Sequence, residues 1–430
     1  MSKQIEYIDT GVNWLGKIPS TWESKRIKML TRVKRGASPR PIDNPIYFDE
    51  DGEFAWVRIA DVTASERYLE NTTQRLSELG SSLSVKRYPD DFFLSIAGTV
   101  GKPIITKIKC CIHDGFVYFP DLKINPEFLY YIFSTGLPYL GLGKLGTQLN
   151  LNTDTVGDIY IPIPDENTID KIVSFLDEKT VEIDNLILKK KTLIDLLREE
   201  RSAIIDKAVT KGINDNVILK YSEIEWLGDI PEHWKISRLK YHTYRIGDGI
   251  HSTPKYTDSS EYYFVNGNNL DNGKITIYSN TRCVDEDELN NYELNLKEGT
   301  IFISLNGTIG NLAIYNGEKI VLGKSAAYIE CQATINNKYV FYFLQSNFIK
   351  KYFENSLNGT TIGNLSLFTL RNSTICFPEV PEQIEIVKFI ENQLSDIDKI
   401  ISRVETEIDL IIEYRTSLIN EVVTGKITLN

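Results

Sequence analysis

The sequence predicts an α+β protein in which two similar mixed α/β domains are separated by two long antiparallel, coiled-coil-like helices related by an internal pseudo-two-fold repeat. Three observations predict this fold. Sequence markers occur twice, about half a chain apart. Each copy ends in an apolar stripe of helical period without interior Gly or Pro. Each copy also contains short strand-like runs divided by turn residues. We expect domains at 1–165 and 213–378, and helices at 166–212 and 379–430.

The composition is that of an ordinary globular chain, with 42% apolar and 25% charged residues. It excludes a disordered chain, a collagen and a small disulfide scaffold. No apolar run approaches the roughly 20 residues that span a bilayer, so we expect no membrane association. The N-terminal MSKQIEYIDTG lacks the apolar core of a signal peptide, and five cysteines without a CxxC pair are typical of reduced thiols. We therefore expect a cytoplasmic protein without a zinc knuckle.

The net charge of −11 argues at first sight against nucleic acid as a partner. The acidity, however, is concentrated in residues 379–430, which carry 5 basic and 11 acidic side chains, whereas residues 1–165 carry 19 and 20. The total charge therefore says little about the surfaces of the other parts.

The first repeated marker is a Trp-Leu-Gly-x-Ile-Pro-x-x-Trp motif. NWLGKIPSTWESKRIK at 13–28 recurs as EWLGDIPEHWKISRLK at 225–240, a shift of 212. The second marker is a Ser-x-x-Gly-Thr-x-Gly loop, because FLSIAGTVGKPII at 93–105 matches FISLNGTIGNLAI at 302–314, a shift of 209. Its glycines are typical of tight turns between strands. The small difference between the shifts indicates that loop lengths differ between the halves.

The third marker opens the helical segments. IVSFLDEKTVEIDNLI at 172–187 aligns with IVKFIENQLSDIDKII at 386–401, and the shift of 214 holds to the Val-Thr pairs at 209–210 and 423–424. The apolar residues follow alternating steps of three and four, as in a two-helix coiled coil. The residues that we expect to pack the helix pair are Ile172, Leu176, Ile183, Leu186, Leu197, Ile386, Ile390, Ile397, Ile400 and Ile411.

An approximate two-fold axis between the halves predicts the helix direction. The first helix starts at the first domain and ends at the second, and symmetry then requires the second helix to return. The helices would run antiparallel and bring the C-terminus near the N-terminus. A translational repeat would instead give a linear array of domains whose helices do not pair antiparallel. We hypothesise the antiparallel arrangement, which holds two globules at a set separation, as a paired reader of two DNA half-sites requires.

None of the sequence patterns that resemble a catalytic motif matches that motif fully. GEKIVLGKS at 317–325 has the wrong glycine spacing for a phosphate loop, and NPIYF at 44–48 lacks the second proline of an adenine methyltransferase motif. The four histidines have no metal-ligand spacing. We therefore predict a non-catalytic chain with neither a catalytic residue nor a metal site.

The evidence for DNA binding is local. KRIKMLTRVKRGASPR at 25–40 has seven basic residues and no acid, and its residues Arg32, Lys34, Arg35 and Arg40 run into a Gly/Pro/Ser loop suited to phosphate contact. The alternative is a solvated basic loop. The corresponding stretch at 241–258 is less basic and offers Arg245, His251, Thr253, Lys255 and Tyr256.

Further candidates occur at matched places in the two halves. Polar side chains of different type at matched places are what two different base-reading surfaces require. These candidates are Arg58 and Asp61 against Asn266 and Asn269, Thr99 against Thr308, and Thr147 and Gln148 against Thr360 and Thr361.

The doubled WLGxIPxxW motif, SxxGTxG loop, GTQ/GTT loop and IVxFLD helix entry, in this order, resemble the specificity (S) subunit of Type I restriction–modification systems. The resemblance covers essentially the whole chain. It implies two target-recognition domains that each read half of a bipartite site in double-stranded DNA, and helices that set the spacer and dock two modification (methyltransferase) subunits. It also implies restriction subunits in the complex. It places S-adenosylmethionine, ATP and Mg²⁺ on those partner subunits and no cofactor on this chain.

Two readings from other classes stay open at this stage. The first is a non-catalytic structural adaptor whose two globules bind proteins. The second is a free-standing enzyme with an unrecognised site. A steep fall of DNA affinity with salt separates DNA recognition from the adaptor.

Overall fold

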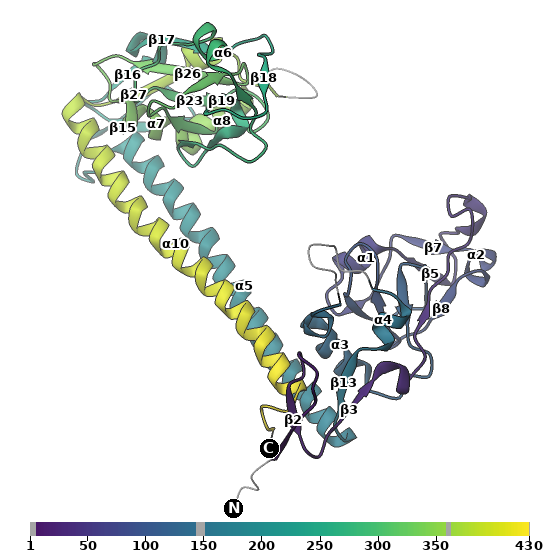
Figure 1. Ribbon diagram of the computed structural model, residues 1–430. Helices are drawn as coiled ribbons and strands as arrows, with labels where there is room; N and C mark the ends of the chain where they lie inside the picture. The colour runs from purple at the N-terminus through teal and green to yellow at the C-terminus, as the bar shows by residue number, and fades with distance from the viewer. Residues whose placement is uncertain (1–5, 143–150, 358–362, 430) are drawn as a thin grey trace, which may run out of the picture. The chain divides into compact units, whose positions relative to one another are not determined.

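The computed structural model describes residues 6–142, 151–357 and 363–429 (Figure 1). The chain divides into two compact units, one formed by Met1–Lys190 with Thr406–Asn430 and the other by Lys191–Glu405. Each unit holds one globular domain and portions of two long helices, α5 (Glu166–Lys211) and α10 (Val380–Val423). This is the predicted mixed α/β architecture with two long helices.

The first domain is built on two sheets. The five-stranded sheet has the order β4-β12-β9-β10-β6; its β10–β6 pair is parallel and its other pairs are antiparallel. The four-stranded sheet has the order β7-β5-β11-β8, with a parallel β5–β11 pair. Strands buried along their whole length explain the continuous apolar runs. The bounds are β4 (Lys34–Arg35), β5 (Phe54–Val57), β6 (Tyr68–Leu69), β7 (Gln74–Leu76), β8 (Val85–Arg87), β9 (Phe92–Ser95), β10 (Pro103–Thr106), β11 (Cys110–Ile112) and β12 (Phe116–Tyr118).

Shorter elements complete the first domain. A hairpin of β1 and β2 carries the first marker, and β3 pairs with β13 beside the start of α5. Helix α3 is capped by Asn125, whose side chain accepts a hydrogen bond from the backbone N–H of Glu127, and has proline at its first position. The bounds are β1 (Tyr7–Asp9), β2 (Lys17–Pro19), β3 (Glu23–Arg26), β13 (Tyr160–Ile163), α1 (Ile59–Ala64), α2 (Glu78–Ser82), α3 (Pro126–Ser134) and α4 (Thr153–Gly157).

The second domain repeats this plan with one strand fewer in one of its two sheets. Its two four-stranded sheets have the orders β17-β26-β23-β24 and β18-β22-β19-β25. The hairpin β14–β15 and the pair β16–β27 take the places of β1–β2 and β3–β13. The strand bounds are β14 (Leu219–Tyr221), β15 (Asp229–Pro231), β16 (Lys235–Arg238), β17 (Thr243–Asp248), β18 (Tyr256–Thr257), β19 (Tyr262–Val265), β20 (Leu270–Asp271), β21 (Lys274–Ile275), β22 (Cys283–Val284), β23 (Ile301–Ser304), β24 (Leu312–Ile314), β25 (Ile320–Leu322), β26 (Ala326–Cys331) and β27 (Thr374–Phe377). The helices are α6 (Glu286–Asn291), α7 (Asn337–Gln345), α8 (Asn347–Asn355) and α9 (Leu367–Asn372).

The second marker forms the same turn in both domains. The backbone N–H of Gly101 donates to the carbonyl of Ser95 at 2.8 Å, and that of Gly310 donates to the carbonyl of Ser304 at 3.0 Å. Gly101 has φ of 85° and Gly310 has φ of 86°, in the left-handed region that glycine adopts without strain. These glycines therefore serve the turn between β9 and β10 and between β23 and β24.

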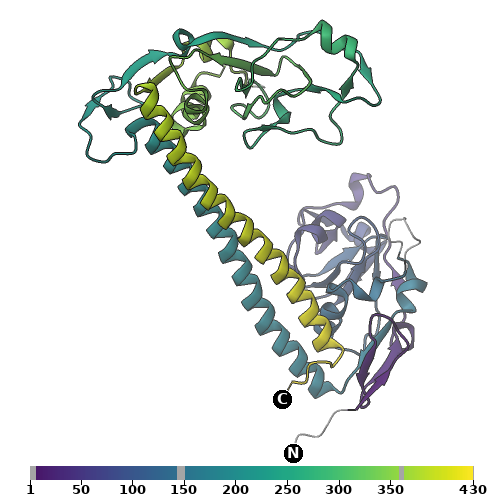
Figure 2. The same ribbon diagram turned by 60° about the vertical axis from the view of Figure 1, so that its left-hand side comes forward.

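The long helices pack antiparallel within each unit, as both views show (Figures 1 and 2). In the first unit the start of α5, including Ile172 and Leu176, shares a core with Leu418 and Val422 near the end of α10. In the second unit Val209 near the end of α5 shares a core with residues 386–390 near the start of α10. Within the described residues, no helix is long and apolar enough to cross a membrane.

Most of the predicted helix-pair residues are buried, but two are not. Seven are at most 9% exposed and Ile411 is half-buried, whereas Leu186 and Ile400 are each 44% exposed. The buried stripe runs 176–180–183 in steps of four and three, so its next step of four reaches Ile187, and the equivalent residue of α10 is Ile401. The prediction was therefore wrong by one position at Leu186 and Ile400. The seven buried residues are Ile172, Leu176, Ile183, Leu197, Ile386, Ile390 and Ile397.

Candidate nucleic-acid interface

A groove of about 1620 Å³ opens on the first domain. Four segments line it: the loop 38–50, the residues 56–58 at the end of β5, the run 72–75 and the turn 113–114. Its polar lining mixes the cations of Arg40, Arg58 and Arg75 with the amide of Gln74 and several carboxylates. A wall that offers both donors and acceptors suits the reading of base edges better than the binding of phosphates alone.

Arg58 and Asp61 sit together at the start of α1, but only Arg58 reaches the groove. The Asp61 carboxylate accepts hydrogen bonds from the backbone N–H of Arg58 at 2.9 Å and from its Nε at 3.5 Å. Asp61 is 8% exposed. Its prediction as a DNA contact is wrong, because the carboxylate is committed to capping the helix.

Arg40 lies at the rim of the groove with a side chain that is 78% exposed. Its Nη2 donates to Asp114 Oδ2 at 3.1 Å, and Nε of Arg35 donates to the carbonyl oxygen of Asp114. The turn at 113–114 therefore orients two of the predicted phosphate contacts.

His113 lines the groove as a neutral side chain. Its Nδ1 accepts a hydrogen bond from the backbone N–H of Gly115 at 2.8 Å, so Nε2 carries the proton. Burial lowers the pKa of His113. The groove therefore gains a neutral N–H donor, which the scattered histidines of the sequence did not indicate.

The basic stretch splits into two parts in the structure. Arg26 and Lys28 both form half-exposed ion pairs with Asp158, at 3.2 and 2.6 Å, which connect β3 and the residues after it to the segment before β13. Arg32 precedes β4, the edge strand of the five-stranded sheet, and Lys34 and Arg35 form that strand; all three are exposed. An edge strand that presents cations is suited to the phosphate backbone.

The exposed residue Thr99 lies on the β9–β10 turn against α1. Its hydroxyl is 2.6 Å from that of Thr63. Its counterpart Thr308 is also exposed, at the β23–β24 turn. Thr147, Gln148, Thr360 and Thr361 lie outside the described residues.

The guanidinium of Arg245 forms hydrogen bonds within the second domain. Its Nε contacts Glu330 at 2.6 Å, and its Nη2 donates to the carbonyl oxygens of Leu294 and Asn295 at 2.7 and 2.9 Å. The Glu330 hydrogen bond raises the pKa of Arg245, which stays charged in this site. Arg245 therefore ties β17 to the neighbouring strand and loop, and with a side chain that is 39% exposed its contact with DNA stays a prediction.

The rest of this stretch remains at the surface. His251 is 71% exposed and its Nε2 lies 2.9 Å from Asp248 Oδ2, while Thr253 and Lys255 are exposed. Tyr256 is 37% exposed, and the guanidinium of Arg282 lies 4.5 Å from its ring centre. These residues remain candidates for contact with DNA.

Asn266 and Asn269 repeat the capping arrangement of Arg58 and Asp61. The backbone N–H of Asn266 donates to Asn269 Oδ1 at 3.0 Å, and Asn269 is 3% exposed. Asn269 also donates from Nδ2 to Thr281 and to the carbonyl of Thr276. Asn269, like Asp61, is therefore a buried cap, and the prediction of a DNA contact is wrong for Asn269 and Asp61, whereas Asn266 is half-buried and stays a candidate.

The two domains place different side chains on one backbone frame. Gly36 donates its N–H to the carbonyl of Phe116, and Gly249 donates to that of Ala326. Phe116 donates in turn to the carbonyl of His113, and Ala326 to that of Gly323. The matched hydrogen bonds place the exposed Lys324 of the second domain where the first domain has Asp114. The matched helix caps place Asn266 where the first domain has Arg58.

Sequence reasoning missed Gln74, His113 and Lys324. Gln74 lies opposite Trp56 in the β5–β7 pair. Only strand pairing brings residues 56, 74 and 113 to one groove, so no local signal marked them. Among the described residues, no group of three potential ligands could hold a metal ion.

A family model described as the Type I restriction modification DNA specificity domain matches the chain twice, at residues 19–195 and 240–410. The chain belongs to this family. The Type I restriction enzyme MjaVIII specificity subunit of Methanocaldococcus jannaschii is 28% identical, over 96% of this chain and 94% of that protein. The EcoBI specificity subunit of Escherichia coli is 20% identical, over 98% and 90%.

Solved structures share the fold of this specificity-domain protein. One, from work on complex assembly and conformational transition of the type I restriction–modification system, has a TM-score of 0.70 at 15% identity, over 95% of this chain and 99% of that one. The HsdS subunit of Thermoanaerobacter tengcongensis has a TM-score of 0.50 at 13% identity, over 95% and 98%. These structures show the fold; the two matches of the family model and the relatives over nearly the whole chain support a DNA-recognition subunit with two domains, and the adaptor interpretation is not favoured.

Proposed function

We propose that this specificity-domain protein is the non-catalytic, cytoplasmic subunit of a Type I restriction–modification complex in which each globular domain reads one half of a bipartite site in double-stranded DNA. The observation that carries the proposal is that the two domains share the same backbone turns and caps but place different side chains on them. Arg58 and Asn266 begin the same capping motif, and Asp114 and Lys324 occupy the same turn. A shared frame places both readers alike on a duplex, and different side chains read different bases.

The helices supply the second half of the proposal, which is the docking of two modification subunits. Exposed apolar residues recur at a shift of 214 as Leu186 and Ile400, each 44% exposed, and as Leu196 and Leu410, 56% and 58% exposed. The first unit therefore carries Leu186 and Leu410, and the second unit carries their counterparts Ile400 and Leu196. Two equivalent apolar surfaces support two copies of one partner.

The paired helices also set the spacer between the half-sites in this proposal. S-adenosylmethionine then belongs to the modification subunits, ATP and Mg²⁺ belong to restriction subunits, and this chain binds no cofactor. The turn of β9 and β10, which holds Thr99, and the edge strand β4 supply contacts to the sugar-phosphate backbone.

The test is methylation mapping of cells with and without this chain, in the presence of its modification subunits. We expect adenine methylation at one bipartite sequence with a constant spacer, and its disappearance when the chain is removed. The purified complex should bind that sequence at least about 10³-fold more tightly than a scrambled duplex. Equal affinity for the two duplexes would exclude sequence recognition.

A further inference from the structure

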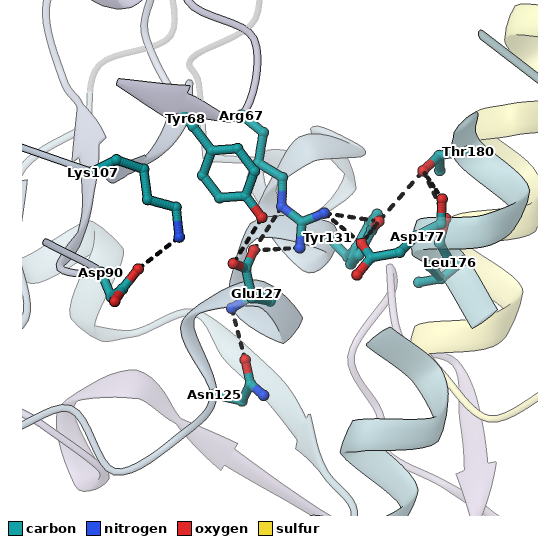
Figure 3. A network of polar contacts seen from close by, with 10 residues as sticks. All are labelled: Arg67, Tyr68, Asp90, Lys107, Asn125, Glu127, Tyr131, Leu176, Asp177 and Thr180. Atoms are coloured by element: carbon teal, nitrogen blue, oxygen red, sulfur yellow. Dashed lines mark hydrogen bonds and ion pairs between the residues drawn. The ribbon is translucent and has the colours of Figure 1, made fainter. Parts of the chain in front are cut away.

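Arg67 joins the first domain to helix α5 through a partly buried network of polar groups (Figure 3). It lies between α1 and β6 with a side chain that is 16% exposed. Its Nε donates to Glu127 Oε2 of α3 at 2.6 Å, and its Nη1 donates to the hydroxyl of Tyr131 at 3.1 Å. The same Nη1 forms an ion pair with Asp177 of α5. One guanidinium therefore contacts two helices.

Aromatic rings enclose the guanidinium. Its central carbon lies 5.1 Å from the ring centres of Tyr68 and Tyr130 and 4.8 Å from that of Tyr131, within the range of cation–π attraction. Burial and the hydrogen bond to Glu127 raise the pKa of Tyr68 to about 12, so its hydroxyl remains a donor to Glu127 at 2.9 Å. The surroundings keep the cation charged and oriented.

The network continues into the helix. The hydroxyl of Tyr131, a residue 1% exposed, donates to Asp177 Oδ1 at 2.6 Å and lies 3.4 Å from the hydroxyl of Thr180. Thr180 donates to the carbonyl of Leu176 at 2.6 Å. Tilting the domain on α5 would therefore break several directional contacts at once.

The second domain has a glycine where the first has Arg67. The backbone N–H of Ile105 donates to the carbonyl of Arg67 at 3.1 Å, and that of Ile314, its counterpart in the second marker, donates to the carbonyl of Gly273 at 3.0 Å. Gly273 has φ of 78°, and a Cβ there would lie 3.0 Å from the ring of Phe341. A large side chain has no room at this position.

The charges at the second junction are also different. Glu127 corresponds to Lys338, and Asp177 corresponds to Glu391. Lys338 Nζ and Glu391 Oε1 form an ion pair at 2.7 Å, with side chains that are 49% and 40% exposed. Exposed pairs of this kind stabilise little.

We propose that Arg67 is a positioning residue that holds the reading face of the first domain in one orientation on α5, so that the complex accepts one spacer length. The argument rests on the proposed function. Arg67 follows α1, whose first turn begins at Arg58 in the groove, so a fixed Arg67 fixes the wall of the groove relative to the helix. In the second domain Gly273 takes this place and an exposed ion pair takes the place of the Arg67 network, beside other hydrogen bonds to the long helices such as that from the Tyr339 hydroxyl to the carbonyl of Val209.

The spacer is the quantity that this geometry controls. Adding one base pair moves a half-site by roughly 3.4 Å along the duplex and rotates it by roughly 35°. A domain that cannot tilt loses contacts on the displaced half-site, whereas a loosened domain recovers part of them. Loss of the Arg67 network should therefore reduce discrimination between spacers more than it reduces affinity for the natural site.

The experiment uses the full chain assembled with its modification subunits. The mapped target is prepared with its natural spacer and with spacers one base pair shorter and longer, and Kd is measured for the wild type, Arg67→Lys and Asp177→Asn. Arg67→Lys keeps the charge but cannot donate to Glu127 and Asp177 at the same time from a planar guanidinium, and Asp177→Asn removes the negative charge that pairs with Arg67, at a residue that is 46% exposed. We expect the ratio of Kd between wrong and natural spacers to fall about tenfold in both variants.

Lys338→Met is the matched control, and its spacer ratio should stay within about twofold of the wild type. Thermal melting establishes which variants are folded; if Arg67→Lys does not fold, Asp177→Asn decides. Folded variants with an unchanged spacer ratio overturn the positioning role and leave the proposed function standing. A wild-type complex that binds mapped and scrambled duplexes equally overturns both.

Discussion

Arg415 of α10 and Asp184 of α5 are joined by two hydrogen bonds, from Nε to Oδ1 at 2.9 Å and from Nη2 to Oδ2 at 3.2 Å. The second unit holds the equivalent pair, Arg201 Nε and Asp398 Oδ1, at 3.5 Å. Each residue is related to its counterpart by the shift of 214. An arginine of either helix can meet an aspartate of the other in both units only when the helices run antiparallel.

The Arg415–Asp184 pair should stabilise the helix pair modestly. Its side chains are 28% and 54% exposed, so solvent screens the attraction, and we expect a coupling energy of about 0.5 kcal/mol. A double-mutant cycle with Arg415→Ala and Asp184→Asn measures it by urea denaturation. The longer Arg201–Asp398 pair provides the control cycle, and it should give a smaller value. A larger coupling at Arg201 would contradict this ranking.

Removing the cations of the β4 edge should weaken DNA binding without changing its sequence preference. In the variant with Arg32, Lys34 and Arg35 all replaced by alanine, we expect the slope of log K against log salt to flatten by about one unit per lost phosphate contact. The measurement is a salt titration of the assembled complex. The control replaces Lys171, Lys189 and Lys191 of α5, which are also exposed, by alanine. Equal slopes in the wild type and the β4 variant would remove this strand from the interface.

Gln74→Ala should relax recognition at one base pair. Gln74 is exposed beside the groove opposite Trp56, and an amide can read adenine through two hydrogen bonds. We expect a loss of about 1–3 kcal/mol on the mapped site and a smaller loss on a site changed at that position. Competition binding with single-substitution duplexes measures it. A uniform loss on every duplex would assign Gln74 to the phosphate backbone.

His113 should make the protein less stable in mild acid. Its folded pKa lies below the ordinary value of about 6.5, so the unfolded chain takes up the proton first as the pH falls. The contribution of His113 is therefore complete above that value and is lost as the pH falls through it toward the folded pKa. Urea denaturation at about pH 7.5 and pH 5.5 should show a larger loss of stability in the wild type than in His113→Gln. Parallel pH dependences would show that His113 titrates alike in both states.

Leu196→Asp combined with Leu410→Asp should prevent assembly with the modification subunits and leave the isolated chain folded. Both leucines are exposed, so the change removes no core packing from this chain but places charge in the proposed docking surfaces. Size-exclusion chromatography with light scattering measures assembly, and thermal melting checks folding. The single variants should each lose one of the two partner subunits. Full assembly of the double variant would place the docking surface elsewhere.

The sequence by itself determined the two-domain plan and the two long helices. Repeats and apolar periodicity are local properties, and a constant shift of 214 shows that the two helical segments match without insertions. The antiparallel direction of the helices stayed a hypothesis until the structure showed which segments share a core. The same periodicity could not separate neighbouring apolar residues. The partly buried Ile187 takes the position in the stripe that was predicted for Leu186, because the choice between a step of three and a step of four depends on the partner helix.

Tertiary structure alone decided which polar residues are available to DNA. Asp61 and Asn269 look like readers in the sequence, but local backbone geometry turns them into helix caps. No sequence pattern marks Gln74 or His113 as a candidate, and strand pairing between distant segments brings them to one groove. The contrast between Arg67 and Gly273 is likewise invisible in the sequence, because only the matched hydrogen bonds of Ile105 and Ile314 show that these residues occupy the same place.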